Sequence, residues 1–82
     1  MFHVYIIVSD TYSERYYIGF SSRPHDRLTE HNAAKNPSTA PFVPWRFAAL
    51  FSFSSEQKAR RFERYLKGGS GRAFLRRLRN ND

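Results

Sequence analysis

Two short segments rich in aromatic and β-branched residues constrain the fold of this chain more than any other feature. Residues 2–8 read FHVYIIV and residues 15–20 read RYYIGF, and the polar stretch SDTYSE lies between them. This pattern predicts a β-hairpin over residues 2–20. Because both alternating faces of residues 2–8 are largely apolar, we expect the first strand to be central in a sheet that is covered on both sides.

A helix and a third strand are expected to follow the hairpin. SSRPHDRLTEHNAA predicts a helix with an N-cap at Ser22 and an end near Ala34, because Pro24 is tolerated in a first helical turn. The next segment, KNPSTAPFVP, has three prolines and is typical of a loop. WRFAALFSF, residues 45–53, then predicts a strand.

Two more helices are expected at the C-terminal end. Ser54 and Gln57 match a capping box before EQKARRFERYLK, whose apolar residues have helical spacing. Gly68 is expected to end that helix in a left-handed cap, and RAFLRRL, residues 72–78, predicts a short third helix. We therefore expect one domain over residues 1–82 of the α/β (α+β) class, in the order ββαβαα, with a small three-stranded mixed sheet flanked by helices.

Composition and charge favour a nucleic-acid partner. The chain has 14 Lys and Arg against 7 Asp and Glu, a formal net charge of +7 that attracts polyanions. The alternative explanation of this basic surface is solubility alone. The absence of cysteine excludes disulfides and thiolate zinc sites. The N-terminal residues do not have the pattern of a secretory signal, so we expect a cytoplasmic protein without membrane association.

Two pairs of residues at helical spacing are candidates for chemistry. Arg27 and His31 are four residues apart, so their side chains share one face of the first predicted helix, whereas Glu30 is expected to point elsewhere. Glu63 and Lys67 have the same spacing in the second helix. An ordinary surface ion pair is the alternative interpretation of Glu63 and Lys67.

Taken together, these segments resemble the GIY-YIG nuclease superfamily. VYII at residues 4–7 and YIG at residues 17–19 match the two motifs that give the family its name, and Arg27, His31 and ARRFERYLK follow in the family's order. The chain is most similar to small single-domain members related to the catalytic (URI) domain of UvrC, and the resemblance extends to EHN and GSGRAFL. It departs at His3, where the family's first motif begins with glycine.

The resemblance implies an endonuclease that hydrolyses DNA phosphodiester bonds with Mg²⁺ or Mn²⁺, possesses structure specificity and serves DNA repair or recombination. Glu63 would bind the metal, a role that suits a hard cation with several waters. Arg27 would stabilise the phosphate, and Tyr5 would position water or phosphate. Either Tyr17 or His31 would be the general base, and the sequence leaves this choice open.

Several further residues are candidates for contact with nucleic acid. Gly19 would let the backbone or a phosphate come close, and the alternative is a glycine that marks only a bulge. Cationic side chains would bind phosphates without reading sequence; they are Lys35, Arg60, Lys67, Arg72 and Arg76. Phe42 and Trp45 are candidates for stacking on a base, although a tryptophan at the start of a strand is more often a core residue. DNA is the expected partner, with RNA and a targeting protein as further candidates.

The rival interpretation is a nucleic-acid-binding module of the same fold with little or no cleavage activity. A protein-interaction adaptor is a third hypothesis, and in either case the two tyrosines would be half-buried strand aromatics. These hypotheses differ in geometry. A nuclease site requires Tyr5, Tyr17, Arg27, His31 and Glu63 to converge in one cleft, whereas Glu63 facing away from Tyr17 would contradict it.

Overall fold

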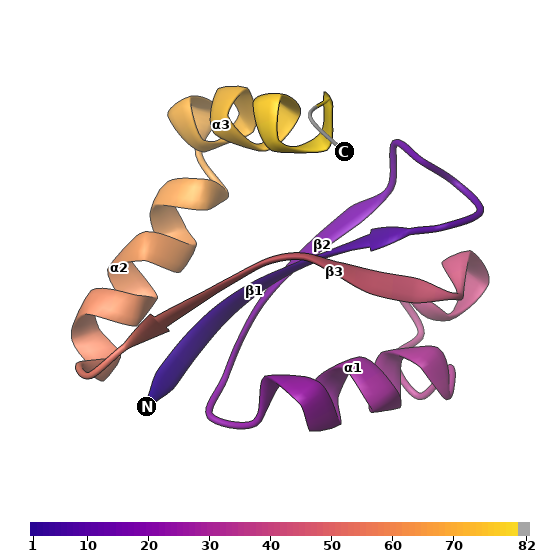
Figure 1. Ribbon diagram of the computed structural model, residues 1–82, viewed down its shortest axis with the longest axis horizontal. Helices are drawn as coiled ribbons and strands as arrows, with labels where there is room; N and C mark the ends of the chain where they lie inside the picture. Colours follow the sequence, from indigo (N-terminus) through magenta and orange to yellow (C-terminus); the bar gives the residue numbers. More distant parts are fainter. Residues whose placement is uncertain (81–82) are drawn as a thin grey trace.

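The computed structural model describes residues 1–80, in which a three-stranded sheet lies between helices (Figure 1). The predicted order ββαβαα is confirmed. The elements, in chain order, are β1 (Phe2–Ser9), β2 (Tyr16–Ser21), α1 (Pro24–Asn32), a 3₁₀ turn (Ala40–Phe42), β3 (Trp45–Phe53), α2 (Glu56–Leu66) and α3 (Gly69–Asn80).

The sheet has the strand order β2-β1-β3, and both pairings are antiparallel. The prediction of a mixed sheet was therefore wrong. β2 and β3 do run in the same direction, as the intervening helix α1 suggests, but β1 lies between them and separates the two parallel strands. β2 and β3 are consequently the two edges of the sheet.

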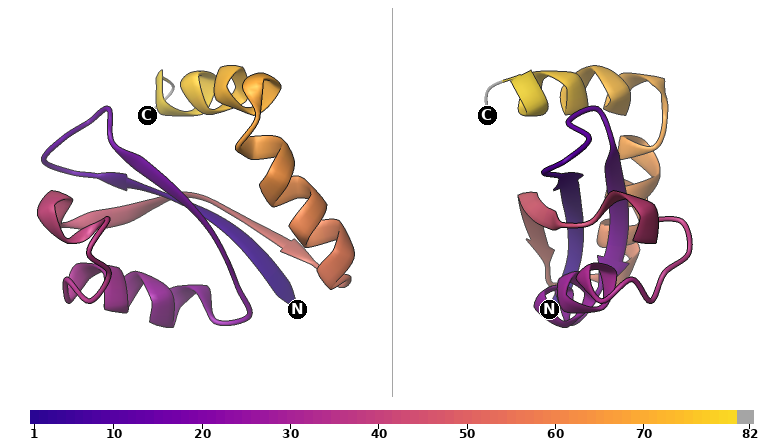
Figure 2. Two further views of the ribbon diagram at one scale, coloured as in Figure 1. Left: turned by 180° about the vertical axis from the view of Figure 1, so that it is seen from behind. Right: turned by 90° about the vertical axis from the view of Figure 1, so that its right-hand side faces the viewer.

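The central strand β1 is buried on both faces, as predicted (Figure 2). Val4 and Ile6 pack with apolar residues of α2 and α3 in one core cluster. Tyr5 and Ile7 point to the opposite face and form a second cluster with Trp45, on the side covered by α1. Each alternating side chain of β1 thus belongs to one of two cores, and Tyr5 belongs to the core beneath α1.

The first helix is shorter than predicted at both ends. It begins at Pro24 with Arg23 in the N-cap position, and no side chain caps it, so the predicted cap at Ser22 is wrong. It ends at Asn32, because Ala34 has a φ of 60°, in the left-handed region that stops a helix.

The ends of the other two helices also differ from the prediction. The Oγ of Ser55, not of Ser54, accepts a hydrogen bond from the backbone N–H of Lys58 and caps α2. Gly68 does not adopt a left-handed conformation. Instead, the chain turns tightly into α3, which begins at Gly69, earlier than the predicted residue 72. Among residues 1–80, no helix combines the length and apolar character needed to cross a bilayer.

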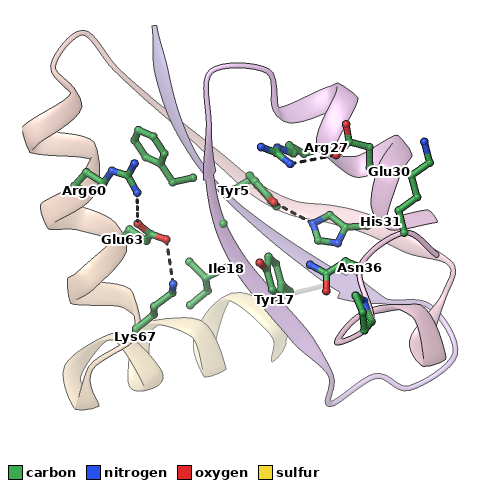
Figure 3. A pocket seen from close by; sticks show the side chains of 14 residues that line it. Tyr5, Tyr17, Ile18, Arg27, Glu30, His31, Asn36, Arg60, Glu63 and Lys67 are labelled. Carbon is green, nitrogen blue, oxygen red and sulfur yellow. Dashed lines mark hydrogen bonds and ion pairs between the residues drawn. The ribbon is translucent and has the colours of Figure 1, made fainter. Parts of the chain in front are cut away.

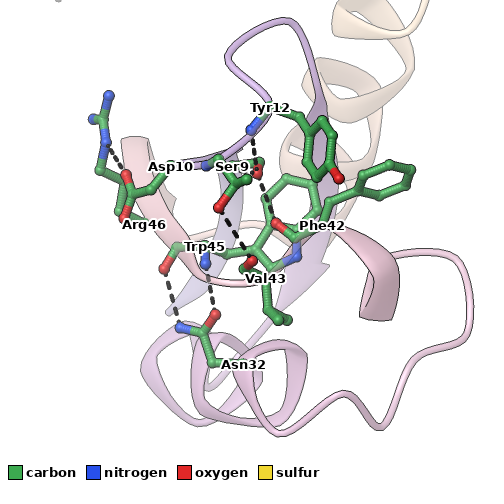
Figure 4. Close-up of polar contacts among 9 residues, drawn as sticks. Ser9, Asp10, Tyr12, Asn32, Phe42, Val43, Trp45 and Arg46 are labelled. Carbon is green, nitrogen blue, oxygen red and sulfur yellow. Dashed lines mark hydrogen bonds and ion pairs between the residues drawn. The ribbon is translucent and has the colours of Figure 1, made fainter.

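Side chains fasten the loop between α1 and β3 to the rest of the fold (Figure 4). Asn32 donates its Nδ2 proton to the Trp45 carbonyl at 3.0 Å and accepts from the Trp45 backbone N–H at 2.6 Å. The hydroxyl of Ser9 donates to the Phe42 carbonyl at 2.6 Å. The indole of Trp45 is 4% exposed and donates to the Thr39 carbonyl at 2.9 Å, so it is a core residue and not a stacking platform.

Candidate functional site

A cavity of about 590 Å³ lies between α1 and α2, beside the edge strand β2 (Figure 3). Five residues singled out from the sequence line it: Tyr5, Tyr17, Arg27, His31 and Glu63. They come from four different elements, and Glu63 faces the same space as Tyr17. Glu63 does not face away from Tyr17, which was the arrangement that would have contradicted a common site.

The cavity wraps around the open edge of β2. Tyr17, Ile18, Gly19 and Phe20 are consecutive, and all four line it. Because successive residues of a strand point to opposite faces, one cavity can contact all four only by extending over the strand edge. One wall therefore belongs to α1, which lies on one face of the sheet, and the other wall belongs to α2 on the opposite face.

Tyr5 and His31 form the buried centre of the site. The Tyr5 hydroxyl lies 3.0 Å from His31 Nε2, and the two residues are 3% and 4% exposed. On the other side of the imidazole, Nδ1 is 2.8 Å from the hydroxyl oxygen of Thr39, which is also buried. Both ring nitrogens thus have protein partners, and the ring orientation is fixed.

Burial shifts the pKa values of both groups. The pKa of Tyr5 is raised from 10.0 to about 12, mainly because burial penalises the phenolate and further because of the neighbouring Tyr17. The pKa of His31 is lowered from its ordinary value of 6.5, first by burial and then by the positive charge of Arg27. At neutral pH the pair therefore consists of a neutral phenol and a neutral imidazole.

Gly19 has a structural reason in the packing of the two strands. It pairs directly with Tyr5 in the β1–β2 register. A Cβ at Gly19 would collide with the ring and hydroxyl of Tyr5. The space that a side chain would fill is already occupied by the Tyr5 ring, so the fold requires glycine here, and the backbone of Gly19 also lines the cavity.

Tyr17 completes the aromatic part of the site. Its ring centroid lies 4.8 Å from that of His31 and 6.3 Å from that of Tyr5. Tyr17 is half-buried, so its ring borders the open cavity while Tyr5 and His31 lie behind it. The adjacent Tyr16 packs against the other core and beneath Arg79.

Arg27 is held by Glu30, a residue that we had expected to point elsewhere. The guanidinium donates to the Glu30 carboxylate at 3.2 Å, and both side chains line the cavity. The expectation for Glu30 was wrong because residues three apart also share a helix face. The i,i+3 spacing of Arg27 and Glu30 is the sequence signal that could have identified this contact.

The carboxylate of Glu63 lies between two cations on the opposite wall. Lys67 Nζ is 3.0 Å from Oε2, and Arg60 lies 3.9 Å from Oε1. The side chain of Glu63 is only 16% exposed, which distinguishes it from an ordinary surface ion pair. Arg60 itself is positioned over the ring of Phe20, at 3.8 Å from the centroid.

The side chains at the cavity fit only one kind of divalent-metal site. Residues 1–80 contain no group of three or more His, Asp or Glu side chains that could enclose an ion. The Lys67 ammonium shows that the Glu63 carboxylate already holds a cation at the cavity wall. One carboxylate beside an open cavity fits a hard ion that keeps several waters, and does not fit a site closed by protein ligands.

The remaining cationic candidates are distributed unequally. Lys35, Arg60 and Lys67 line the same cavity as the five central residues. Arg72 lines a smaller cavity of about 280 Å³, which also borders Tyr17 and Lys67. Arg76 is exposed on α3 and lines neither cavity.

The contacts of His3 and Thr39 are visible only in the folded structure. His3, which replaces the motif glycine, lies 2.8 Å from the Ser52 hydroxyl and is not among the residues that line the cavity. Thr39, which sequence reasoning missed, lies behind His31, and its position in a loop rich in proline carries no local signal for that contact.

Comparison with known proteins identifies the family. The sequence model of the GIY-YIG catalytic domain matches residues 1–78, nearly the whole chain. The chain belongs to the GIY-YIG family. No curated protein and no solved structure matches it. The GIY-YIG domain is a nuclease domain, so the assignment agrees with the order of motifs along the chain.

Proposed function

We propose that this GIY-YIG domain is a divalent-metal-dependent endonuclease that hydrolyses DNA phosphodiester bonds. One observation carries the proposal: two tyrosines, an arginine, a histidine and a glutamate, far apart in sequence, line one cavity at the edge of β2. Such a cavity combines a cationic group for phosphate, a carboxylate for a metal and groups that can exchange protons with water.

Each side chain has a part in the proposed reaction. Arg27, exposed over about half of its side chain, would leave Glu30 and bind the phosphate through its planar guanidinium. Glu63 would hold Mg²⁺ or Mn²⁺, and such an ion supplies stabilisation of negative charge on the phosphate and the leaving oxygen. Tyr5 would position water, and the proton acceptor would be Tyr17 or His31.

The proposed substrate is DNA with a branch, a single-stranded segment or damage, in a setting of repair or recombination. Resemblance to the UvrC catalytic domain supports this choice. The openness of the cavity over a sheet edge also supports it, since a strand can pass across the edge of β2 between α1 and α2. A targeting protein would supply any further selection, because residues that bind phosphate carry no sequence information.

The test is a nicking assay on supercoiled plasmid and a branched oligonucleotide, with Mg²⁺, with Mn²⁺ and with chelator. Glu63→Gln removes the charge of the carboxylate at nearly constant shape. We expect it to lower the cleavage rate more than about 100-fold, because the metal and its charge stabilisation are lost. Tyr17→Phe tests the phenol in the same assay.

Glu56→Gln is the matched control. Glu56 lies in the same helix and also contacts Arg60, at 3.7 Å, but it does not line the cavity. We expect this variant to cleave at the wild-type rate. If wild-type protein binds both substrates in a salt-sensitive manner and cleaves neither with any metal, the endonuclease proposal is wrong and the binding-module hypothesis is favoured.

A further inference from the structure

Thr39 occupies an unusual position behind the imidazole of His31. It is 2% exposed, so its hydroxyl is out of reach of a substrate in the cavity. Its Oγ1 lies 2.8 Å from His31 Nδ1 and 3.4 Å from the Asn36 carbonyl oxygen. Its own carbonyl accepts the indole N–H of Trp45. The threonine is therefore held in place independently of His31.

One placement of the protons satisfies every hydrogen bond in the series Tyr5, His31, Thr39 and Asn36. When the Thr39 hydroxyl donates to the Asn36 carbonyl, its oxygen is free to accept the proton of His31 Nδ1. Nε2 of His31 is then unprotonated and accepts the Tyr5 hydroxyl at 3.0 Å. Every proton from Tyr5 to Asn36 has an acceptor in this arrangement.

The opposite tautomer satisfies fewer groups. If Nε2 carries the proton, it must donate to Tyr5, and the Tyr5 proton points away from His31. Thr39 must then donate to Nδ1, so the Asn36 carbonyl loses the Thr39 hydroxyl. The Asn36 carbonyl still accepts the backbone N–H groups of Thr39 and Ala40, at 3.1 and 2.9 Å, so the cost falls on the buried Tyr5 hydroxyl, whose proton loses its acceptor. This cost favours the arrangement in which Nδ1 is protonated.

We propose that Thr39 is a positioning residue that fixes the ring and the Nδ1–H tautomer of His31, and so presents Nε2 to Tyr5 as a proton acceptor. The inference rests on the proposed hydrolysis and deepens it. A water proton passes to the Tyr5 oxygen as the Tyr5 proton passes to Nε2, which forms the imidazolium. The hydroxide forms a bond to phosphorus, the bond to the leaving oxygen breaks, and that oxygen takes a proton from solvent.

The fold prepares this acceptor before a substrate arrives. Asn32 of α1 forms hydrogen bonds with both the backbone N–H and the carbonyl of Trp45, and the Trp45 indole donates to the Thr39 carbonyl. Contacts from α1 and β3 therefore fix the loop that carries the threonine. His31 is on α1 and Tyr5 is on β1. A displaced loop would move Thr39 and disturb the contact between His31 and Tyr5. Thr39 thus has the role of a supporting residue, which holds a catalytic side chain in its productive orientation.

The tautomer can be measured directly by long-range ¹H–¹⁵N correlation NMR of the histidine side chains at pH 8. The His31 signal is assigned by its loss in His31→Gln. We expect Nδ1 to be protonated in wild-type protein and in Thr39→Ser, which keeps the hydroxyl. Thr39→Val keeps the shape but removes the acceptor, and we expect its His31 to shift toward the Nε2–H form. Thr29→Val, an exposed substitution on α1, is the matched control.

Cleavage assays give a second readout. We expect Thr39→Val to lower kcat about 10-fold or more with little change in KM, and Thr39→Ser to restore it. An Nε2–H tautomer in wild-type protein, or an unchanged tautomer or kcat in Thr39→Val, would overturn the inference. If wild-type protein cleaves no substrate, the proposed function fails, and the part of Thr39 in that reaction fails with it. The NMR spectra still decide whether Thr39 sets the tautomer.

Discussion

Gly19 and Tyr5 face each other across the β1–β2 pair, and neither position can be understood alone. A methyl group at Gly19 would overlap the Tyr5 ring. We expect Gly19→Ala to lower the free energy of unfolding by about 1–3 kcal/mol, because overpacking must displace the ring or the strand. Urea-induced unfolding followed by circular dichroism measures the change.

The cause is tested by repeating the substitution in a Tyr5→Val background. Without the ring there is space for the methyl group, so Gly19→Ala should cost much less, and the double-mutant cycle should show strong coupling. Gly69→Ala is the control, because no heavy atom outside its chain neighbours and its own helix backbone lies within 4 Å of the position that its Cβ would take. Equal costs in the two Tyr5 backgrounds would show that the ring is not what requires glycine.

His31 makes stability depend on pH in a defined direction. Its pKa is lowered in the folded protein, mainly by burial and then by Arg27, so below pH 6.5 the unfolded chain binds more protons than the folded chain. The stabilisation is present above the unfolded pKa and is lost as pH falls toward the folded pKa. We expect the free energy of unfolding to fall between pH 7.5 and 5.5.

Urea unfolding at the two pH values separates this contribution from that of other groups. His31→Gln should lose less stability on acidification than wild-type protein, because the buried imidazole is absent. His25→Gln makes the same change at an exposed position and should retain the wild-type loss. Identical losses in wild-type protein and His31→Gln would mean that burial of His31 does not penalise its protonation.

At the scale of elements, prediction succeeded where a local pattern decides the structure. The bounds of β3 agree with the prediction, because residues 45–53 have strong strand propensity after a loop rich in proline. The early start of α3 was missed because close packing between α2 and α3 decides it. Gly71 allows α3 to start early, since a Cβ there would meet the backbone of Tyr65 and Leu66 at the end of α2.

The site residues also fall into those that local sequence patterns reveal and those that only the fold reveals. Tyr17, Arg27, His31 and Glu63 could be selected from motif order and helical spacing, and the cavity brings them together with Tyr5. Thr39 could not be selected, because it reaches His31 only when the loop folds back over α1. The mixed sheet was predicted wrongly for a similar reason: local patterns define strands, but not which strand lies between two others.

At the scale of the whole molecule, the positive charge is not equally available to a ligand. Arg79 donates to the Glu14 carbonyl and packs over the ring of Tyr16, so it serves the fold. Four other cations line the main cavity: Arg27, Lys35, Arg60 and Lys67. Nucleic acid bound at the edge of β2 would therefore release counterions at this cavity, and the molecule's formal net charge of +7 would contribute at longer range.

Substituting Lys35 and Lys58 in the same way compares the contribution to DNA binding of a cation at the main cavity with that of a cation elsewhere. Lys35 lines the main cavity, whereas Lys58 lies on the other side of α2 beside Phe53 and Tyr65. We expect Lys35→Gln to weaken duplex DNA binding for all sequences alike and to reduce the slope of log K against log salt by about 0.9, because one phosphate contact is lost. Binding is measured by fluorescence anisotropy in chelator, so that cleavage does not interfere.

Lys58→Gln should leave the slope unchanged, although both substitutions remove one positive charge. The comparison distinguishes a localised binding surface from a general attraction. General attraction depends on net charge, and each variant would then lose the same small amount of affinity. If the two slopes fall together, the DNA does not bind preferentially at the edge of β2, and the cavity between α1 and α2 is not its binding site.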